Sequence, residues 1–394
     1  MMVTSIFFIN TVYGQSCGPS NLNGSVRTIS CAQTCTNLNF KVPHLKSTGD
    51  YILSTIPYNP FPFIVATGGT EFDGLYSDDE YSNLFTLPFP FCFYDSSYNK
   101  AVIGSNGLIT FDENVAGCAN AWTINNPIPF NSNSGSFSCS GSIGPYYPKT
   151  AIMPDFSDLD PRPSTSGFDV NYFASPPDRK IQWRVEGTAP CRRFVVSFFH
   201  IGTYGRGSTV GSLSYDNPTT FQVILFEGSG IIEYHVLQKL LNSTTNNNTA
   251  IMGIQDFTRN RAVAAPGRNN TVWTATNEGW RFTPSGGASR FVKSELLTLG
   301  LVPVALADTA TSVAGQLDLN FPNICPVSNS QQYIVRTTFA TCVGATDIVT
   351  LDTITINRIT SLPATATFTQ TTCGNANGTV TKRDTRKWYF TISI

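Results

Sequence analysis

Three carboxylates stand close together in the segment Asp155-Phe-Ser-Asp158-Leu-Asp160, with Asp169 a short distance on. Carboxylate oxygens are the ligands that Ca²⁺ prefers in proteins. The segment lacks the glycine and the distal glutamate of an EF-hand loop, and a second acidic run, Asp78-Asp79-Glu80, is a weaker candidate. Asp155, Asp158 and Asp160 are therefore candidate calcium ligands. The commoner alternative is a turn-forming loop whose aspartates bond their own backbone.

Residues that could support catalysis are few and lack a recognisable arrangement. The chain has three histidines, His44, His200 and His235, and none adjoins a serine or cysteine nucleophile motif. A zinc-protease motif, a nucleophile elbow and a phosphate-binding loop are all missing from the sequence. An acid of the 155–160 segment with Glu227 or Glu233 would have glycosidase chemistry, but nothing in the sequence positions such a pair. We therefore expect a protein that is not an enzyme.

Composition indicates an extracellular protein without a nucleic-acid partner. Charged residues make up 13% of the 394 residues, about half of the roughly 25% that is usual in soluble domains. Solubility must therefore depend on Asn, Thr, Ser and Gln, as is typical of secreted β proteins. The net charge is −1, with Lys and Arg scattered along the chain. We expect no basic surface for nucleic acid or for an anionic membrane.

Ten cysteines indicate an oxidising compartment. They form no C-x-x-C pair of the kind that a zinc site uses, so disulfides are favoured over metal ligation. Spacing alone does not fix the pairing, but Cys325 and Cys342 lie in one small C-terminal unit and are the disulfide we predict. We expect most cysteines from 17 to 342 to be paired, and Cys373, near the end of the chain, to lack a partner.

The N-terminus has features of a secretion signal. The run Val3–Tyr13 is short and apolar, and small residues follow it in Gly14-Gln15-Ser16. No basic residue precedes the run, and a buried first strand is the alternative interpretation. We predict a signal peptide at 1–15 and a mature chain that is secreted, without insertion in a membrane.

Short apolar runs alternate with Gly, Pro, Asn and Ser from residue 101 to 284. This pattern is typical of β strands joined by hairpin turns. The pair Asn106-Gly107, flanked by apolar residues, predicts one such tight turn. We therefore expect an all-β fold whose main β-sandwich contains no helix of more than three turns.

The positions of turn residues and cysteines also divide the chain into predicted parts. The predicted parts after the signal peptide are a Cys-rich segment at 16–49, a main β-sandwich at 50–284, a small Ig-like β unit at 285–360 and the start of a truncated adhesin-type repeat at 361–394. The last part rests on a short match in register between Thr341–Thr350 and Thr372–Thr381.

Aromatic residues gather near the end of the main β-sandwich, at Trp273, Trp280 and Phe282. Such residues close a core or form a platform on which sugars stack, and the core is the commoner use. Enclosed tryptophans would favour a general adhesion scaffold. Exposed and coplanar ones would favour a carbohydrate-binding module.

Several of these motifs together resemble a known family. They are IGSNGLITF (103–111), the acidic segment, GTAPCRRFVVSF (187–198), FQVILFEGSGIIEYHV (221–236), AIMGIQD (250–256) and the run Ala265–Pro284. Their succession resembles the N-terminal module of large surface proteins that gliding Bacteroidota export through the type IX secretion system. Residues 367–381 resemble the opening of a SprB-like adhesin repeat. The strand succession also distantly resembles nidogen-type extracellular domains, which implies a role in cell–matrix adhesion.

These observations predict a non-enzymatic, secreted module of an adhesin-like cell-surface protein, itself part of a larger multidomain protein. Its sandwich is expected to bind an extracellular surface, matrix or glycan, with no cofactor other than calcium. The loop tips 202–211 and 242–248, rich in small and polar residues, are the candidate recognition surface. The alternative is a carbohydrate-binding module of a secreted hydrolase whose catalytic part lies outside this sequence.

Overall fold

The computed structural model describes most of the chain between residues 22 and 359. The described residues are 22, 24–131, 139, 147–162, 175–176, 178–204, 218–241, 248–313, 315–342 and 347–359, together with the backbone of three strands after residue 363. The predicted signal peptide, Asp169, Cys373 and most of both loop tips lie outside these residues.

Two compact units make up the chain. The main unit comprises Leu45–Phe291 and the returning segment Phe339–Ile348, and the small unit comprises the flanking segments. The predicted all-β fold is confirmed, because the described residues contain no α-helix; the 3-10 turns include η1 (Asp73–Leu75) and η2 (Glu113–Val115). Within that part of the chain, no helix is long and apolar enough to cross a membrane.

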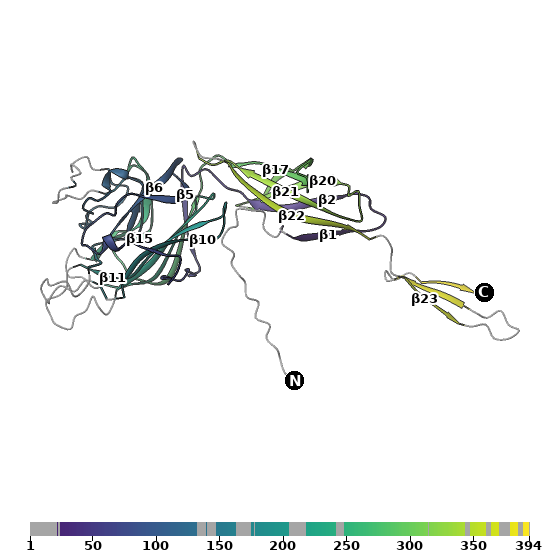
Figure 1. Ribbon diagram of the computed structural model, residues 1–394, viewed down its shortest axis with the longest axis horizontal. Coiled ribbons are helices and arrows are strands. Elements are labelled where there is room, and N and C mark those ends of the chain that lie inside the picture. Colours follow the sequence, from purple (N-terminus) through teal and green to yellow (C-terminus); the bar gives the residue numbers. More distant parts are fainter. Residues whose placement is uncertain are drawn as a thin grey trace, which may run out of the picture. The chain divides into compact units, whose positions relative to one another are not determined.

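Two antiparallel sheets build the main unit (Figure 1). The larger has the order β3-β16-β13-β12-β11-β10-β4, with β9 also paired to β11. Its strands are β3 (Tyr51–Ile56), β4 (Thr70–Glu71), β9 (Leu159–Asp160), β10 (Lys180–Glu186), β11 (Arg193–Thr203), β12 (Thr219–Phe226), β13 (Ile232–Lys239) and β16 (Ala275–Pro284). The second sheet has the order β15-β14-β8-β7-β6-β5. Its strands are β5 (Phe85–Phe93), β6 (Ser96–Gly104), β7 (Leu108–Thr110), β8 (Ala151–Phe156), β14 (Thr249–Gln255) and β15 (Ala262–Val272).

An apolar core fills the main unit because alternate residues of the strands face inward. On β11 and β12 the inward residues are Phe194, Val196, Phe198, Phe221, Val223 and Leu225, all fully buried in one cluster. The rings of Phe198 and Phe221 stack across the two strands, with centroids 4.7 Å apart. The predicted turn joins β6 to β7, and Gly107 adopts the positive φ of 79° that a side chain would disfavour.

Among the described residues, the sandwich of the small unit contains eight strands in two sheets (Figure 1). One sheet has the order β1-β22-β21-β17-β18 and the other β19-β20-β2. The strands are β1 (Ser25–Ile29), β2 (Thr36–Pro43), β17 (Phe291–Thr298), β18 (Pro303–Leu306), β19 (Asp308–Val313), β20 (Gln316–Ile324), β21 (Ser330–Phe339) and β22 (Ile348–Arg358). The Cys-rich segment is therefore not a separate part, because β1 and β2 complete these two sheets. Ile29 and Leu38 are buried in the same core cluster as Phe321 and Val335.

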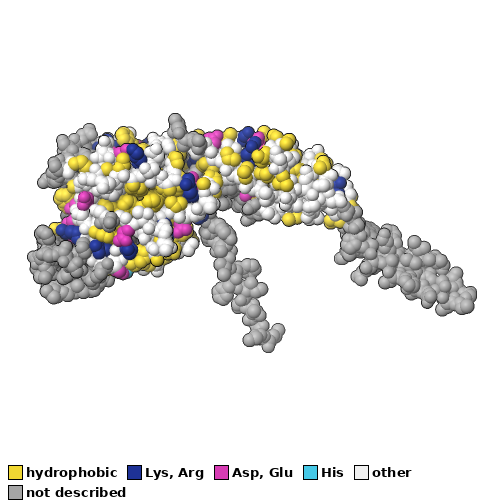
Figure 2. All heavy atoms as spheres, viewed as in Figure 1, with side chains coloured by type: hydrophobic (Ala, Val, Ile, Leu, Met, Phe, Trp, Pro, Cys, Tyr) yellow, Lys and Arg dark blue, Asp and Glu magenta, His cyan; other side chains and the backbone are white. Residues whose placement is uncertain are grey.

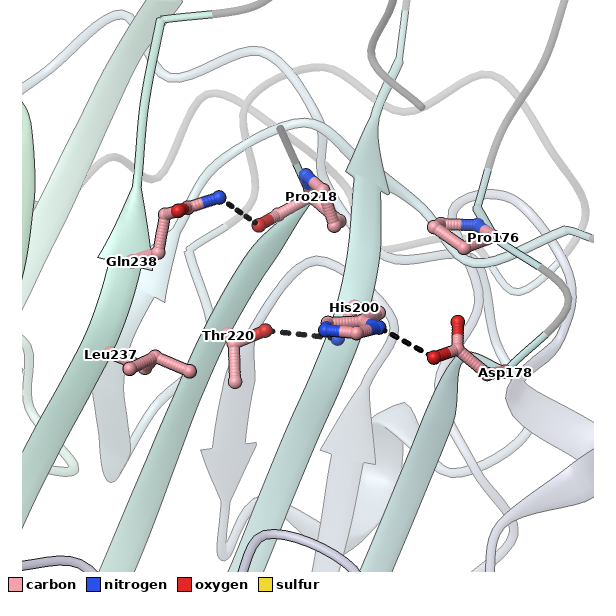
Figure 3. A pocket seen from close by; sticks show the side chains of 7 residues that line it. All are labelled: Pro176, Asp178, His200, Pro218, Thr220, Leu237 and Gln238. Carbon is pink, nitrogen blue, oxygen red and sulfur yellow. Dashed lines mark hydrogen bonds and ion pairs between the residues drawn. The ribbon is translucent and has the colours of Figure 1, made fainter. Parts of the chain in front are cut away.

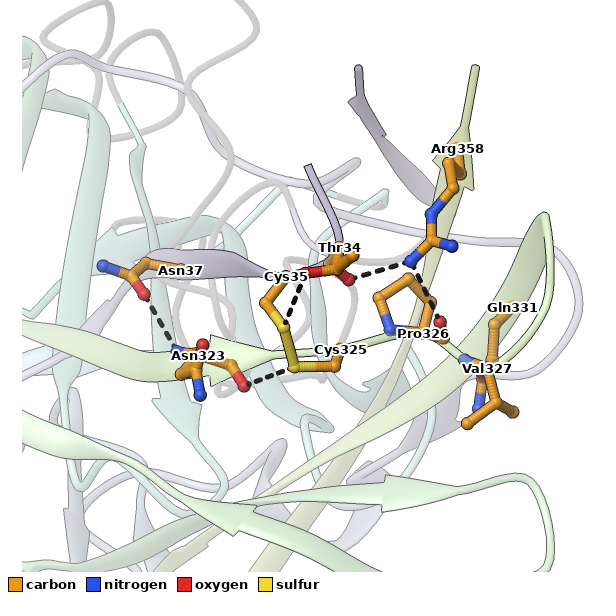
Figure 4. Close-up of a disulfide and its surroundings, with 9 residues drawn as sticks. All are labelled: Thr34, Cys35, Asn37, Asn323, Cys325, Pro326, Val327, Gln331 and Arg358. Atoms are coloured by element: carbon orange, nitrogen blue, oxygen red, sulfur yellow. Dashed lines mark hydrogen bonds between the residues drawn. A yellow bond between two sulfur atoms is a disulfide. The ribbon is translucent and has the colours of Figure 1, made fainter. Parts of the chain in front are cut away.

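Disulfide pairing differs from the prediction. Cys325 pairs with Cys35 and Cys342 with Cys92, so the predicted Cys325–Cys342 disulfide was wrong. The reason is topological: β2 lies beside β20, which brings Cys35 next to Cys325, whereas Cys342 belongs to the segment that returns to the main unit. Around the first disulfide, Arg358 donates to the Thr34 carbonyl at 2.9 Å (Figure 4).

Other cysteines follow the expected redox state. Cys118 pairs with Cys139, and Cys191 is also disulfide-bonded. Cys31 is an exposed free thiol. Most of the described cysteines are thus paired, in agreement with the sequence-based expectation.

The C-terminal segment contributes a further three-stranded antiparallel sheet. It consists of β23 (Ala364–Thr369), β24 (Thr379–Asp384) and β25 (Tyr389–Ser393), in that order. The adhesin-type repeat predicted at 361–394 stays a prediction, although the segment is β-structured as that prediction requires.

Candidate functional site

The three predicted calcium ligands are not brought together. Asp155 is fully buried, and its carboxylate accepts from Ser157 Oγ at 3.0 Å and Thr219 Oγ1 at 3.0 Å and lies 3.3 Å from Lys239 Nζ. The carboxylate of Asp160 accepts from Arg162 Nε at 2.8 Å. Both acids therefore already have cationic protein partners.

Asp158 meets the weaker acidic run instead. One carboxylate oxygen from each of Asp78, Asp79 and Asp158 lies within 4.8 Å of the others, and we call these three residues the acidic cluster. The side chain of Asn106, in the β6–β7 turn, links the two segments: its Nδ2 donates to Asp79 Oδ1 at 2.8 Å and its Oδ1 accepts from Leu159 N at 2.9 Å. The turn therefore positions the cluster.

Two carboxyl groups of the acidic cluster have raised pKa values. Burial and the neighbouring charges of Asp160 and Asp79 together raise the pKa of Asp78 to about 8, against the attraction of Arg162. Burial also raises the pKa of Asp79 to about 6. Arg162 lies 3.1 Å from Asp78 Oδ2 and shares its guanidinium with Asp160. An all-oxygen donor set suits a hard cation, so calcium binding stays a prediction, with Asp158 as the one predicted ligand inside the cluster.

A polar outward face of the larger sheet lies beneath residues 57–65, which we call the covering segment. Gln222 accepts from Phe61 N at 3.0 Å and donates back to its carbonyl at 3.3 Å. Gln182 does the same with Val65, at 2.9 and 3.2 Å. Both glutamines are buried, at 0% and 5% exposure respectively. The sequence analysis did not predict that these glutamines bind the covering segment. Their presence within otherwise apolar strands was the signal that could have indicated it.

His235 belongs to the same covered face. Its Nδ1 accepts from Asn59 N at 3.4 Å and its Nε2 lies 3.3 Å from Glu233 Oε2. Glu233 also forms an ion pair with Arg281. Burial alone would raise the pKa of Glu233, but the bonds to His235 and Arg281 outweigh it and lower the pKa. This histidine therefore has a structural role.

Beyond the covering segment, the described residues of the outward face form a pocket of about 360 Å³ (Figure 3). We call it the His200 pocket. Neighbouring strands supply its polar groups: His200 from β11, Thr220 from β12 and Gln238 from β13. The histidine ring points between Thr220 and Asp178, and its Nδ1 lies 2.8 Å from Asp178 Oδ2. The other lining residues are Pro176, Pro218 and Leu237.

Residues 50–291 match the family model described as NIDO related. The chain belongs to this family. The matched residues cover more than half of the chain, and they support the distant nidogen-type resemblance. No curated protein and no solved structure matches the chain.

Trp273 and Trp280 of the NIDO-related domain pack against neighbouring residues. Trp273 is 7% exposed and belongs to the core, against which Trp280 packs. The guanidinium of Arg268 lies 4.6 Å from the Trp273 ring and 5.2 Å from the Trp280 ring. Trp273 and Trp280 therefore contribute to the core and to its edge rather than to an open pair of rings.

Arginines hold the two glutamates that were considered for glycoside chemistry. Glu227 binds Arg192 through both carboxylate oxygens, at 2.7 and 2.9 Å. Glu233 binds Arg281 on the covered face. Each of these two carboxylates therefore stabilises a local ion pair.

The visible surface carries charges of both signs at scattered positions. In Figure 2, Lys and Arg alternate with Asp and Glu among uncharged and apolar side chains, without a large patch of one sign in this view. This distribution agrees with the low charge of the sequence.

Proposed function

We propose that this chain is a non-enzymatic, secreted module of an adhesin-like protein, whose NIDO-related domain binds an extracellular surface, matrix or polysaccharide. The observation that carries the proposal is the outward face of the larger sheet. Its buried polar side chains are bonded to the covering segment, and beyond that segment it offers a small polar pocket. A rigid face with a prepared pocket suits recognition.

Disulfide chemistry supports the proposed location. Three disulfides, each between described cysteines, fit an oxidising extracellular environment. Attachment to a cell surface is part of the proposal.

The finer relationship to type IX-secreted surface proteins of Bacteroidota is also a proposal. It is supported by the motifs of 103–284 and by the repeat-like residues 367–381. The coding sequence downstream of residue 394 tests it: adhesin repeats and a sorting domain are expected there, whereas a catalytic domain would support the hydrolase alternative.

Binding of the full chain to immobilised polysaccharides and matrix proteins tests the proposed function. We expect saturable binding to at least one ligand class, with the ligand recovered unaltered. The same chain after thermal unfolding is the control. Failure to bind any of these surfaces, or release of cleaved ligand, would contradict the proposal.

A further inference from the structure

The His200 pocket is built by irregularities in three neighbouring strands. The pairing of β11 with β12 shifts register between Phe198 and Ile201, and the pairing of β12 with β13 shifts between Thr220 and Phe221. Such bulges re-aim side chains at the ends of sheets. His200 lies within the first bulge and adopts a left-handed backbone, with φ of 53°. A non-glycine residue adopts this conformation only where its surroundings hold it.

Hydrogen bonds fix the polar groups of the pocket in advance. His200 N donates to Thr220 Oγ1 at 3.0 Å, and the ring is held by Asp178. Gln238 Nε2 donates to the Pro218 carbonyl at 3.2 Å, so its amide oxygen is oriented as an acceptor. Thr220 is almost fully buried, at 1% exposure. Little conformational freedom would be lost when a ligand binds.

Charge restricts the class of ligand. Among the described residues that line the pocket there is one carboxylate, Asp178, and no Lys or Arg. A phosphate, sulfate or carboxylate ligand would meet this carboxylate without a compensating lysine or arginine. A neutral ligand is therefore favoured.

The hydrogen-bonding groups of the pocket restrict the class of ligand further. Carboxylate and amide oxygens accept, an imidazole nitrogen donates or accepts, and a hydroxyl does both. Adjacent hydroxyl groups of a ligand match such a mixed set. Pro176, Pro218 and Leu237 supply apolar contacts for the carbon skeleton of the ligand. The cavity of about 360 Å³ lies at the small end of the range for ligand pockets, so it suits a single small ring.

We infer that the His200 pocket binds one neutral sugar residue of an extracellular glycan. This inference rests on the proposed function and names the ligand class of the same outward face. Asp178 and Gln238 bind the ring hydroxyls, and His200 positions Asp178.

The test is saturation-transfer NMR and calorimetry of the full chain with neutral hexoses and their oligosaccharides, beside sialylated and sulfated glycans. Asp178→Ala and Gln238→Ala are each expected to weaken binding of the neutral sugar about tenfold or more, since each removes a hydrogen bond to the ligand. Glu113→Ala is the matched control. Glu113 is also an exposed carboxylate paired with one base, Lys100 at 3.4 Å, away from the pocket. Unchanged melting temperatures establish that the variants fold.

Binding to immobilised polysaccharides and matrix proteins is measured on the same variants, which separates the two proposals. If the wild-type chain attaches but neither pocket variant loses sugar binding or attachment, the pocket inference is wrong and the proposed function stands. Preference for anionic glycans would also overturn the inference. If the wild-type chain attaches to no surface yet binds a neutral sugar at the pocket, the inference stands and the proposed function fails.

Discussion

Two regions of the main unit bury polar side chains, and they do so in opposite ways. On the covered outward face, each described glutamine meets both a backbone donor and a backbone acceptor, and Glu233 meets Arg281. In the acidic cluster, three carboxylates lie close to one another, and the guanidinium of Arg162 lies beside Asp78. The polar groups named in the first region are paired within the fold, whereas burial in the second raises the pKa values of Asp78 and Asp79.

The two regions therefore differ in role: buried polar groups of the first hold the structure together, and those of the second change their charge with conditions. On the covered face, the paired polar side chains fix the position of the covering segment and make that part of the outward face rigid. The acidic cluster changes its charge with pH, because the pKa values of Asp78 and Asp79 are raised to about 8 and about 6. Substitutions should therefore destabilise the covered face under all conditions, and those in the acidic cluster should act only in a particular range of pH or calcium concentration.

The largest expected effect is on the covered face. Arg281→Met leaves Glu233, 6% exposed, without its main cation, and we expect about 3 kcal/mol of lost unfolding free energy. Denaturant unfolding at pH 7 measures it. Lys100→Met, which breaks an exposed ion pair, is the control and should cost less than about 1 kcal/mol. Equal losses of unfolding free energy in the two variants would show that the buried ion pair contributes no more than the exposed one, which would contradict the account.

A smaller loss is expected at the covering segment. Gln222→Leu leaves the Phe61 N–H and carbonyl without their side-chain partner, at a cost of about 2 kcal/mol. Limited proteolysis should then cut within residues 57–65. The control is Gln331→Leu, because Gln331 also accepts a backbone N–H, from Val327, but at an exposed position. A covering segment that stays protected in the Gln222 variant would contradict this role.

Stability of the acidic cluster should depend on pH. The folded pKa of Asp78 is about 8 against an ordinary value of 3.8, so the folded chain holds a proton that the unfolded chain releases. This contribution is complete below about pH 4 and is lost as pH rises through about 8. With a chelator present, Asp78→Asn should flatten the fall in melting temperature between pH 5 and pH 8, relative to the wild-type chain. The same fall in both proteins would contradict the assignment.

Calcium should give the smallest effect, and only where the cluster is ionised. At pH 8 and a calcium concentration ten times Kd, selective binding to the folded chain adds about 1.4 kcal/mol. Asp158→Asn should abolish the rise in melting temperature. Asp155→Asn should lower the baseline, because Asp155 pairs with Lys239, but keep the calcium-dependent rise. If calcium does not shift the melting temperature of the wild-type chain, the calcium site is wrong and Asp158 belongs to an ordinary turn.

Local signals in the sequence were enough to predict the class of fold. Alternation of apolar residues predicted the sandwich, and Asn106-Gly107 predicted the turn that joins β6 to β7.

Long-range pairing was beyond such signals. Cys35 and Cys325 are 290 residues apart, and Asp158 meets Asp78 only because the Asn106 turn bridges their segments. The covering segment has no periodic pattern, and its partners Gln182 and Gln222 lie on strands far along the chain. The bulge at His200 is a backbone feature that composition does not reveal.

The most direct test of the central claim is hydrogen–deuterium exchange of the full chain with and without the glycan or matrix that it binds. If ligand is bound at the open end of the outward face, exchange should slow around His200, Thr220 and Gln238 and stay unchanged in the small unit. Protection confined to the small unit, with these three positions unaffected, would contradict the claim that the NIDO-related domain binds through this face.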